Sequence, residues 1–145
     1  MNDLFFKAMN GVHRVMLAAS GGRLGHDLMN MPVLELTTTG AKSGQKRTSI
    51  LTTPVQEGDT IVVVASRGGD PQHPAWFHNL KANPDVEVSL RGRPKRPMRA
   101  RVADADERAR LWPLITKRYS GYADYQKRAT REIPVVLLDP VSATD

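Results

Sequence analysis

The sequence predicts a mainly β member of the α+β class, an antiparallel barrel of about six strands with helices at its periphery. Two observations favour this fold. Short segments rich in β-branched residues recur along the chain, and most are joined by short turns that contain glycine or proline. The regular alternation of strands and helices that would give a doubly wound parallel sheet is missing. With 145 residues and neither repeats nor a linker, the chain should form one domain, residues 1–145.

Six segments carry the strand pattern, residues 33–39, 49–55, 60–66, 85–90, 98–102 and 133–138. Residues 60–66, TIVVVAS, form an unbroken apolar run, which is typical of a central strand covered on both faces. In residues 85–90 and 98–102 apolar and polar residues alternate, so each strand should leave one face in solvent. Pro134 predicts a sheet edge or a strand start for the last segment, because proline cannot donate to the hydrogen-bond ladder.

The first 32 residues are expected to form a helix and a connection. Residues 3–19 place apolar side chains on one broad face at helical spacing, and the glycine-punctuated residues 20–32 lead to the first strand. A helix of this kind normally packs against its own domain. A peripheral contact of residues 3–19 with a membrane surface stays open as the alternative.

Two further helices are expected. One begins near Pro74 and ends at Asn83, since proline is tolerated in a first turn and the Asn-Pro pair stops a helix. The other begins at Asp104, whose side chain can cap the helix with Glu107 three residues on, and runs to about residue 118. Pro113 lies inside this helix and predicts a kink or a break.

Composition narrows the classes of function. Because the chain has no cysteine, neither a disulfide nor a thiolate metal site can form, and its histidines show no i, i+4 pair for a metal. No apolar run reaches the roughly 18 residues of a membrane span and no signal-peptide pattern is visible, so a cytoplasmic protein is expected. Neither a G-x-S-x-G nucleophile motif nor a Rossmann glycine pattern occurs, so any chemistry should belong to a bound cofactor.

The chain is basic, with a net charge of +6 and a pI near 10.0. This charge would suit nucleic acid, an anionic lipid surface or an anionic small molecule, and solubility alone would also explain it. The arginine-rich residues 91–101 look like one solvated face, and no aromatic platform accompanies them. Nucleic acid is therefore not the expected partner.

A basic turn, TTTGAKSGQKRTS (37–49), separates the first two strand segments. Gln45 stands where a P-loop requires glycine, and a strand rather than a helix follows, so the turn is a glycine-bearing hairpin and not a P-loop. Its cations and exposed backbone N–H groups would suit an anionic group. A merely solvated hairpin is the alternative.

A second glycine-rich loop follows the central strand. It begins after Ser66 with Arg67, Gly68 and Gly69 and leads into the next helix. Backbone amides beside a helix N-terminus favour an anion, so this loop is a second candidate binding site. Trp76 in that helix either stacks on a ligand ring or closes the core.

All three tyrosines fall in the short stretch RYSGYADYQ, as Tyr119, Tyr122 and Tyr125. At a spacing of three they would share one face of a helix. A packed aromatic stripe is the ordinary explanation of such a pattern. The neighbouring Gly121 and several charged residues favour instead an exposed, mobile segment that covers a flat ligand as a lid.

Four stretches occur together and in order, LTTTGAKSGQKR, VVVASRGGDPQHPAWFHNLKANPDVEV, RYSGYADYQ and IPVVLLDP. Over about residues 33–140 they resemble the deazaflavin-dependent nitroreductase family of actinobacteria. The resemblance implies an FMN-binding-like split β-barrel. It also implies coenzyme F-420 as cofactor, a phosphorylated deazaflavin that carries an oligoglutamate tail.

The resemblance assigns roles to residues of this chain. The basic turn would bind the phosphate and the acidic tail, and backbone at the end of the central strand would face the deazaflavin ring. The implied cofactor-binding residues are Lys42, Ser43, Gly44, Gln45, Arg47, Thr48, Ser49, Ala65, Ser66, Arg67, Gly68, Gly69, Trp76 and Asn79. Tyr119, Tyr122 and Tyr125 would line the substrate pocket, with one hydroxyl as a candidate proton donor. Thr52 and Ala75 stand where the family carries larger residues, which should enlarge or reshape that pocket.

The implied function is hydride transfer from the reduced deazaflavin to an electron-poor small molecule. An activated C=C bond, a quinone and a nitroaromatic are the expected classes of acceptor. Two alternatives stay open, an FMN-binding split-barrel oxidoreductase and a non-catalytic deazaflavin-binding protein. No metal is implied, and the resemblance favours a monomer.

Overall fold

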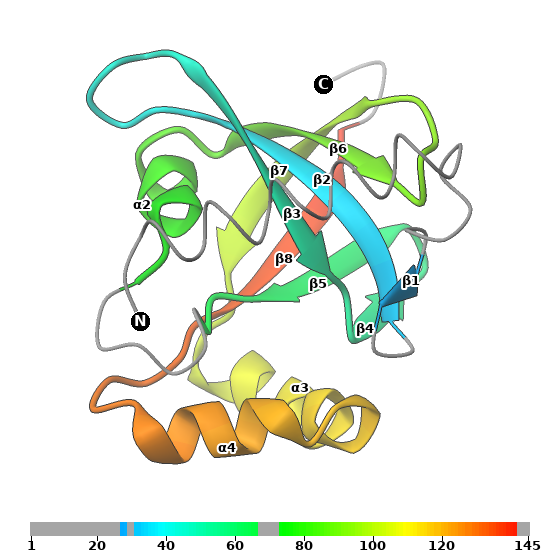
Figure 1. Ribbon diagram of the computed structural model, residues 1–145, viewed down its shortest axis with the longest axis vertical. Coiled ribbons are helices and arrows are strands. Elements are labelled where there is room, and N and C mark those ends of the chain that lie inside the picture. The colour runs from blue at the N-terminus through cyan, green and yellow to red at the C-terminus, as the bar shows by residue number, and fades with distance from the viewer. Residues whose placement is uncertain (1–26, 29–30, 67–72, 142–145) are drawn as a thin grey trace.

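A computed structural model describes residues 27–28, 31–66 and 73–141. These residues form one eight-stranded antiparallel sheet that curls on itself, with three helices around it (Figure 1). The strands are β1 (Asp27–Leu28), β2 (Met31–Thr39), β3 (Lys46–Thr52), β4 (Val55–Glu57), β5 (Thr60–Val64), β6 (Asp85–Leu90), β7 (Arg96–Val102) and β8 (Val135–Pro140). The helices are α2 (Ala75–Ala82), α3 (Ala105–Arg118) and α4 (Gly121–Arg128). The helix expected over residues 3–19 lies outside the described residues.

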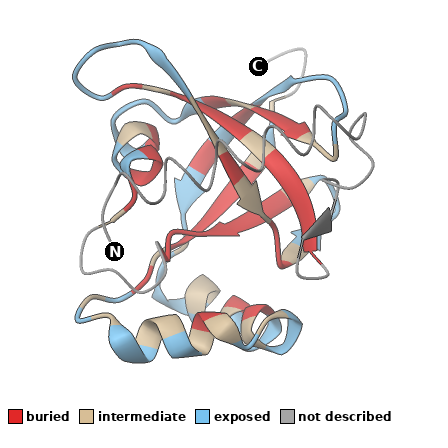
Figure 2. Cartoon of the chain, in the orientation of Figure 1, coloured by how far each residue is buried: buried red, intermediate tan, exposed pale blue. Residues whose placement is uncertain are grey.

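The strand order is β1-β2-β6-β7-β8-β5-β4, and β3 pairs with the other edge of β2. Every pairing is antiparallel, as the sequence predicts. Strands β3 and β4 lie at the two ends of the sheet, and only Thr53 and Pro54 join them. The two ends therefore stay close, and the sheet closes toward a barrel. The long β2–β3 hairpin extends beyond the barrel, and its tip is exposed (Figure 2).

Strand β5 is covered on both faces, which confirms the prediction from its unbroken apolar run. Ile61 and Val63 belong to an inner core, into which α2 packs Trp76, Phe77 and Leu80. Val62 and Val64 belong to a second cluster, in which side chains of α3 and α4 cover the outer face of β5 and β8. The barrel therefore has a core inside and a second core beneath the helix pair (Figure 2).

Three local expectations need correction. The segment 49–55 is not one strand, since Thr53 turns away from the ladder and its hydroxyl lies 2.6 Å from the Val62 carbonyl oxygen. The last strand is not at an edge, because β8 lies between β7 and β5; Pro134 directly precedes it, so the strand-start prediction is confirmed. Pro113 does not break α3, which continues to Arg118 with the proline exposed to solvent, while the alternative of a kink stays a prediction.

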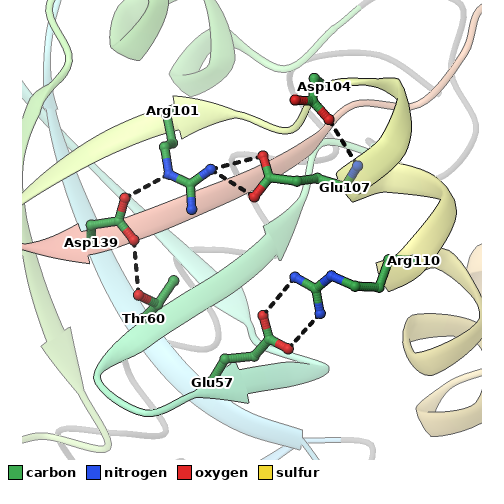
Figure 3. A network of polar contacts seen from close by, with 7 residues as sticks. All are labelled: Glu57, Thr60, Arg101, Asp104, Glu107, Arg110 and Asp139. Carbon is green, nitrogen blue, oxygen red and sulfur yellow. Dashed lines mark hydrogen bonds and ion pairs between the residues drawn. The ribbon is translucent and has the colours of Figure 1, made fainter.

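A polar network holds the start of α3 against the sheet (Figure 3). Arg101 on β7 donates to Asp139 on β8 at 2.7 Å and to both carboxylate oxygens of Glu107 on α3 at 2.8 Å. The hydroxyl of Thr60 on β5 donates to the other oxygen of Asp139 at 2.8 Å. Since one guanidinium bridges two strands and a helix, the network sets where α3 begins.

A second ion pair fixes the middle of α3 (Figure 3). Arg110 donates to the two carboxylate oxygens of Glu57 on β4 at 2.7 and 2.9 Å, and these bonds lower the pKa of Glu57. At the helix N-terminus the Asp104 carboxylate accepts from the Glu107 backbone N–H at 2.8 Å, which confirms the predicted cap.

Candidate functional site

The tip of the β2–β3 hairpin is a compact, exposed loop, as the sequence predicts. Gly40 donates its N–H to the Gln45 carbonyl at 2.7 Å, and Gly44 donates to the Gly40 carbonyl at 3.0 Å. Gly44 has a φ of 72°, which glycine adopts without strain. A Cβ at position 40 would meet the Ser43 hydroxyl, so a larger residue there would displace that side chain.

Asn79 of α2 ties this tip to the body of the protein. Its side-chain oxygen accepts from the Ala41 N–H at 3.0 Å, and its nitrogen donates to the Thr38 hydroxyl at 3.2 Å. The hairpin tip and α2, far apart in the sequence, therefore form one unit. Both were predicted to belong to a cofactor site, but no pattern in the sequence indicated this direct contact.

The tip presents cations rather than free backbone amides. The N–H groups of residues 40, 41, 44 and 45 are bound to the Gln45 carbonyl, Asn79, the Gly40 carbonyl and the Ser43 hydroxyl, respectively. The expected backbone nest is thus largely occupied. Lys46 pairs with Glu87 at 3.4 Å, whereas Lys42 and Arg47 are exposed and have no carboxylate partner in the described part of the chain. Recognition of an anion here would fall on these two side chains.

The residues expected beyond the tip occupy two further places. Thr48 and Ser49 are half-buried in β3, and the Thr48 hydroxyl lies 3.0 Å from that of Thr37. Ala65 and Ser66 are buried after the end of β5. Trp76 is only 7% exposed and belongs to the inner core, so a ligand could reach no more than an edge of its ring. The expected anion-binding residues Arg67, Gly68 and Gly69 lie outside the described ranges.

The three tyrosines form a packed aromatic corner where α3 meets α4. Tyr119 and Tyr122 have ring centroids 5.3 Å apart, and Tyr125 lies 6.0 Å from Tyr122. Tyr122 is 6% exposed, and its hydroxyl lies 3.3 Å from the Thr52 hydroxyl at the end of β3. The predicted exposure is therefore wrong for Tyr122, and the rings pack together as the alternative explanation expects. The mobility of the segment and its role as a lid stay predictions.

The chain bend, rather than helical spacing alone, brings the three rings together. Tyr119 ends α3, whereas Tyr122 and Tyr125 lie on α4. A Cβ at Gly121 would overlap the Tyr119 ring, so the glycine permits this close approach. Burial raises the pKa of Tyr122, and burial with a hydrogen bond to Tyr119 raises the pKa of Tyr125 to about 12. Both hydroxyls are therefore neutral hydrogen-bonding groups at physiological pH.

The hairpin tip and the tyrosine corner lie at opposite ends of β3. Lys46 begins this strand and Thr52 ends it, which separates the two places by roughly 20 Å at about 3.3 Å per residue. The arrangement would therefore suit an elongated ligand with an anionic end at the tip, and not a small compact one.

Two polar residues with no predicted role are Arg131, which contacts the end of β5, and His73, which lies just before α2. Arg131 donates through Nη2 to the Ser66 carbonyl at 2.9 Å. His73 precedes α2, and its buried Nδ1 has no hydrogen-bond partner within the described ranges. Burial and the nearby Arg131 charge lower the pKa of His73. In the sequence, the only signal for a role of these residues is their position: Arg131 just precedes the predicted last strand, and His73 just precedes the helix predicted from Pro74.

Comparison with known proteins places this geometry in a family. A family model described as F420H(2)-dependent quinone reductase matches residues 10–140. An F420H(2)-dependent quinone reductase of Mycobacterium tuberculosis is 43% identical over 135 residues, which cover 88% of this chain and 87% of that protein.

Two solved structures are similar to this chain in both fold and sequence. One, described as an F420-H2 dependent reductase, is 44% identical with a TM-score of 0.66, over 74% of this chain and 94% of that chain. The other, described as a domain-swapped dimer, is 37% identical with a TM-score of 0.65, over 87% of this chain and 94% of that chain. The predicted split-barrel fold is confirmed by these matches, while the expected monomer stays a prediction. None of the described helices is long and apolar enough to cross a membrane.

Proposed function

Because the chain belongs to the F420H(2)-dependent quinone reductase family, we propose that it is an oxidoreductase that uses reduced coenzyme F-420 to reduce a quinone. The observation that carries the proposal is the exposed cationic hairpin tip held to α2 by Asn79. When bound, the reduced deazaflavin supplies a hydride, and this hydride with one proton from solvent converts a quinone into a quinol. The protein supplies binding, orientation and a site with little water.

The hairpin tip would bind the anionic end of the coenzyme. Lys42 and Arg47 are exposed and free of carboxylate partners in the described chain, so they can pair with a phosphate or with the carboxylates of the glutamate tail. Ser43, Gly44 and Gln45 shape the turn that presents these cations. The surplus of six positive charges over the whole chain favours the approach of such an anionic ligand.

The other end of the coenzyme would lie toward the buried backbone of Ala65 and Ser66, with the acceptor near the tyrosine corner. Tyr125, with a pKa of about 12, is a poor proton donor at neutral pH. We therefore assign its hydroxyl, and that of Tyr122, the role of orienting the acceptor through hydrogen bonds. Solvent would then supply the proton, and the separate phenylalanine variants of Tyr122 and Tyr125 should retain turnover with a raised KM for the quinone.

The binding test is a fluorescence titration of the protein with oxidised coenzyme F-420 and, separately, with FMN. Arg47→Ala should weaken F-420 binding about 10-fold, because a charge-assisted contact is lost. Arg93→Ala is the matched control, since Arg93 is also exposed but lies between β6 and β7, and its effect should stay within about 2-fold. Binding of FMN alone would support the flavin alternative, and binding of neither ligand would refute the proposal.

Turnover is tested by anaerobic mixing of the protein with reduced coenzyme and a soluble quinone. The proposal expects oxidation of the coenzyme in proportion to protein, with one quinol formed for each coenzyme oxidised. Tight coenzyme binding without oxidation by a quinone, an activated C=C compound or a nitroaromatic would support the alternative of a non-catalytic binding protein.

We also propose that the protein is a cytoplasmic monomer and that its substrates are small molecules. Light scattering should give the mass of one 16.0 kDa chain. Sedimentation with anionic vesicles tests the alternative, a membrane contact through residues 3–19, and any binding to vesicles should then be lost when these residues are removed.

A further inference from the structure

Residues 131–134, here called the connecting segment, join helix α4 to β8 along the chain. In space they lie between α4 and the end of β5. On one side of this segment the Gln126 side chain of α4 takes the place of a neighbouring strand. Its Oε1 accepts from the Ile133 N–H at 2.8 Å, and its Nε2 donates to the Arg131 carbonyl at 2.9 Å. In an extended chain these two groups, two residues apart, point the same way, and a single amide can pair with both.

Arg108 of α3 completes this side. It donates through Nη2 to Gln126 Oε1 at 3.0 Å and through Nε to the Ile133 carbonyl at 3.1 Å. Its guanidinium lies over the Trp112 ring, 4.4 Å from the centroid, and its side chain is only 18% exposed. Since both partners of Gln126 Oε1 are donors, the orientation of the amide is fixed.

The other side of the connecting segment binds the end of β5. The Pro134 carbonyl accepts from the Ala65 N–H at 3.0 Å, and Arg131 Nη2 donates to the Ser66 carbonyl at 2.9 Å. Between these contacts Ile133 is fully buried in the core beneath the helix pair. Hydrogen bonds on both sides of the connecting segment thus link the helix that carries Tyr122 and Tyr125 to the backbone of residues 65–66.

We propose that Gln126 and Arg131 are positioning residues that fix the tyrosine-bearing helix relative to the backbone of Ala65 and Ser66. This inference rests on the proposed function, in which that backbone faces the coenzyme and the tyrosines orient the acceptor. Both residues act through the groups that they hold. The geometry of hydride transfer is demanding, and a misplacement of about 1 Å can cost on the order of 100-fold in rate.

The first test needs no coenzyme and compares Gln126→Met with Lys127→Met by amide hydrogen exchange. Lys127 is the matched control, because it is the exposed neighbour on the same helix. Gln126→Met should speed exchange about 10-fold in α4 and at the Ala65 N–H, and leave the Ala100 N–H of β7 unchanged. Wild-type exchange at both α4 and Ala65 would overturn the inference.

The second test measures single-turnover oxidation of the reduced coenzyme by a quinone. Arg131→Met should slow this step about 10- to 100-fold while the Kd for F-420 and the KM for the quinone change less than about 3-fold. Arg131→Lys keeps one donor for the Ser66 carbonyl and should recover most of the rate. If Gln126→Met does not fold, Gln126→Glu takes its place. This variant keeps the two contacts in which Oε1 accepts but loses the donor to the Arg131 carbonyl, so its rate should be intermediate.

The outcomes separate this inference from the proposed function. A wild-type protein that neither binds nor oxidises the coenzyme overturns the proposed function. Wild-type turnover with an unchanged rate in Arg131→Met overturns only the positioning roles. A variant that loses rate and affinity in equal proportion also overturns them, since that result indicates general destabilisation of the site.

Discussion

The second core beneath the helix pair makes a prediction that two leucines of one helix can test. Leu111 and Leu114 both lie on α3, one helical turn apart, yet Leu111 is 0% exposed and Leu114 is 46% exposed. Replacing each with alanine removes the same atoms from the same helix. The comparison therefore isolates burial against β5 and β8 from helix propensity, which both changes alter equally.

The expected difference follows from the two environments. Leu111→Ala leaves a cavity in a closed cluster and should cost about 3 kcal/mol of unfolding free energy, within the usual range of about 2–5 kcal/mol. Leu114→Ala removes a half-solvated side chain, and the better helix propensity of alanine offsets part of the loss, so it should cost less than about 1 kcal/mol. For a chain of this size, a 3 kcal/mol loss lowers the Tm by about 6–12 °C.

Urea unfolding followed by circular dichroism measures both variants. The reasoning requires equal m-values, because a changed m-value would mean that the unfolded state or the cooperativity had changed as well. A loss below about 1 kcal/mol in both variants would refute it, since α3 would then not close a core against the sheet. Equal losses above 2 kcal/mol would show instead that Leu114 is covered in solution.

Three further predictions concern the cap, the acid stability and the hairpin anchor. Asp104→Ala should cost about 1 kcal/mol in urea unfolding, whereas Asp104→Asn, which can still cap, should cost less than half of that. Burial of Asp139 opposes ionisation, but hydrogen bonds from Arg101 and Thr60 outweigh it and lower the pKa. The contribution of Asp139 to the free energy of unfolding is thus complete above the unfolded pKa of about 3.9 and is lost as pH falls through the lower folded value. In acid-unfolding measurements, the free energy of unfolding of Asp139→Asn should therefore depend less on pH. Asn79→Ala frees the hairpin tip and should weaken F-420 binding about 10-fold by fluorescence titration, while Asn83→Ala, just beyond the C-terminal end of α2, should change it less than about 2-fold.

The sequence was most informative where local pattern and tertiary environment agree. The apolar run of β5 predicted burial on both faces, and Asp104 with Glu107 predicted a capped helix start; both depend on neighbours close in the chain. Strand ends were less predictable. Lys46 and Arg47 belong to β3, although two cations after a glycine turn look like loop, because pairing with β2 rather than side-chain type extends the strand.

Long-range contacts were beyond prediction for a different reason. Pro134 carries a local signal for an edge or a strand start, and only the order of distant strands decides between them. The Asn79 contact with the hairpin and the Gln126 contact with the connecting segment join residues through side-chain amides. Such amides have no periodicity in the sequence, so the bonds that hold the candidate site together left no pattern to detect.

The burial of the tyrosine corner, which the sequence did not reveal, bears on which residues can determine acceptor specificity. Charged neighbours suggested a mobile lid, yet those charges lie on the solvent side of α4, and Tyr122 on its other side is part of the core. Truncating Tyr122 to alanine should therefore cost about 3–5 kcal/mol, as for other buried aromatic residues. If the acceptor binds at this corner, as proposed, substitution of the tyrosines themselves would reshape the pocket only at a large cost in stability. We predict that substitutions at Thr52, half-buried and bonded to Tyr122, and at the exposed Ala75 change acceptor preference at little cost in stability.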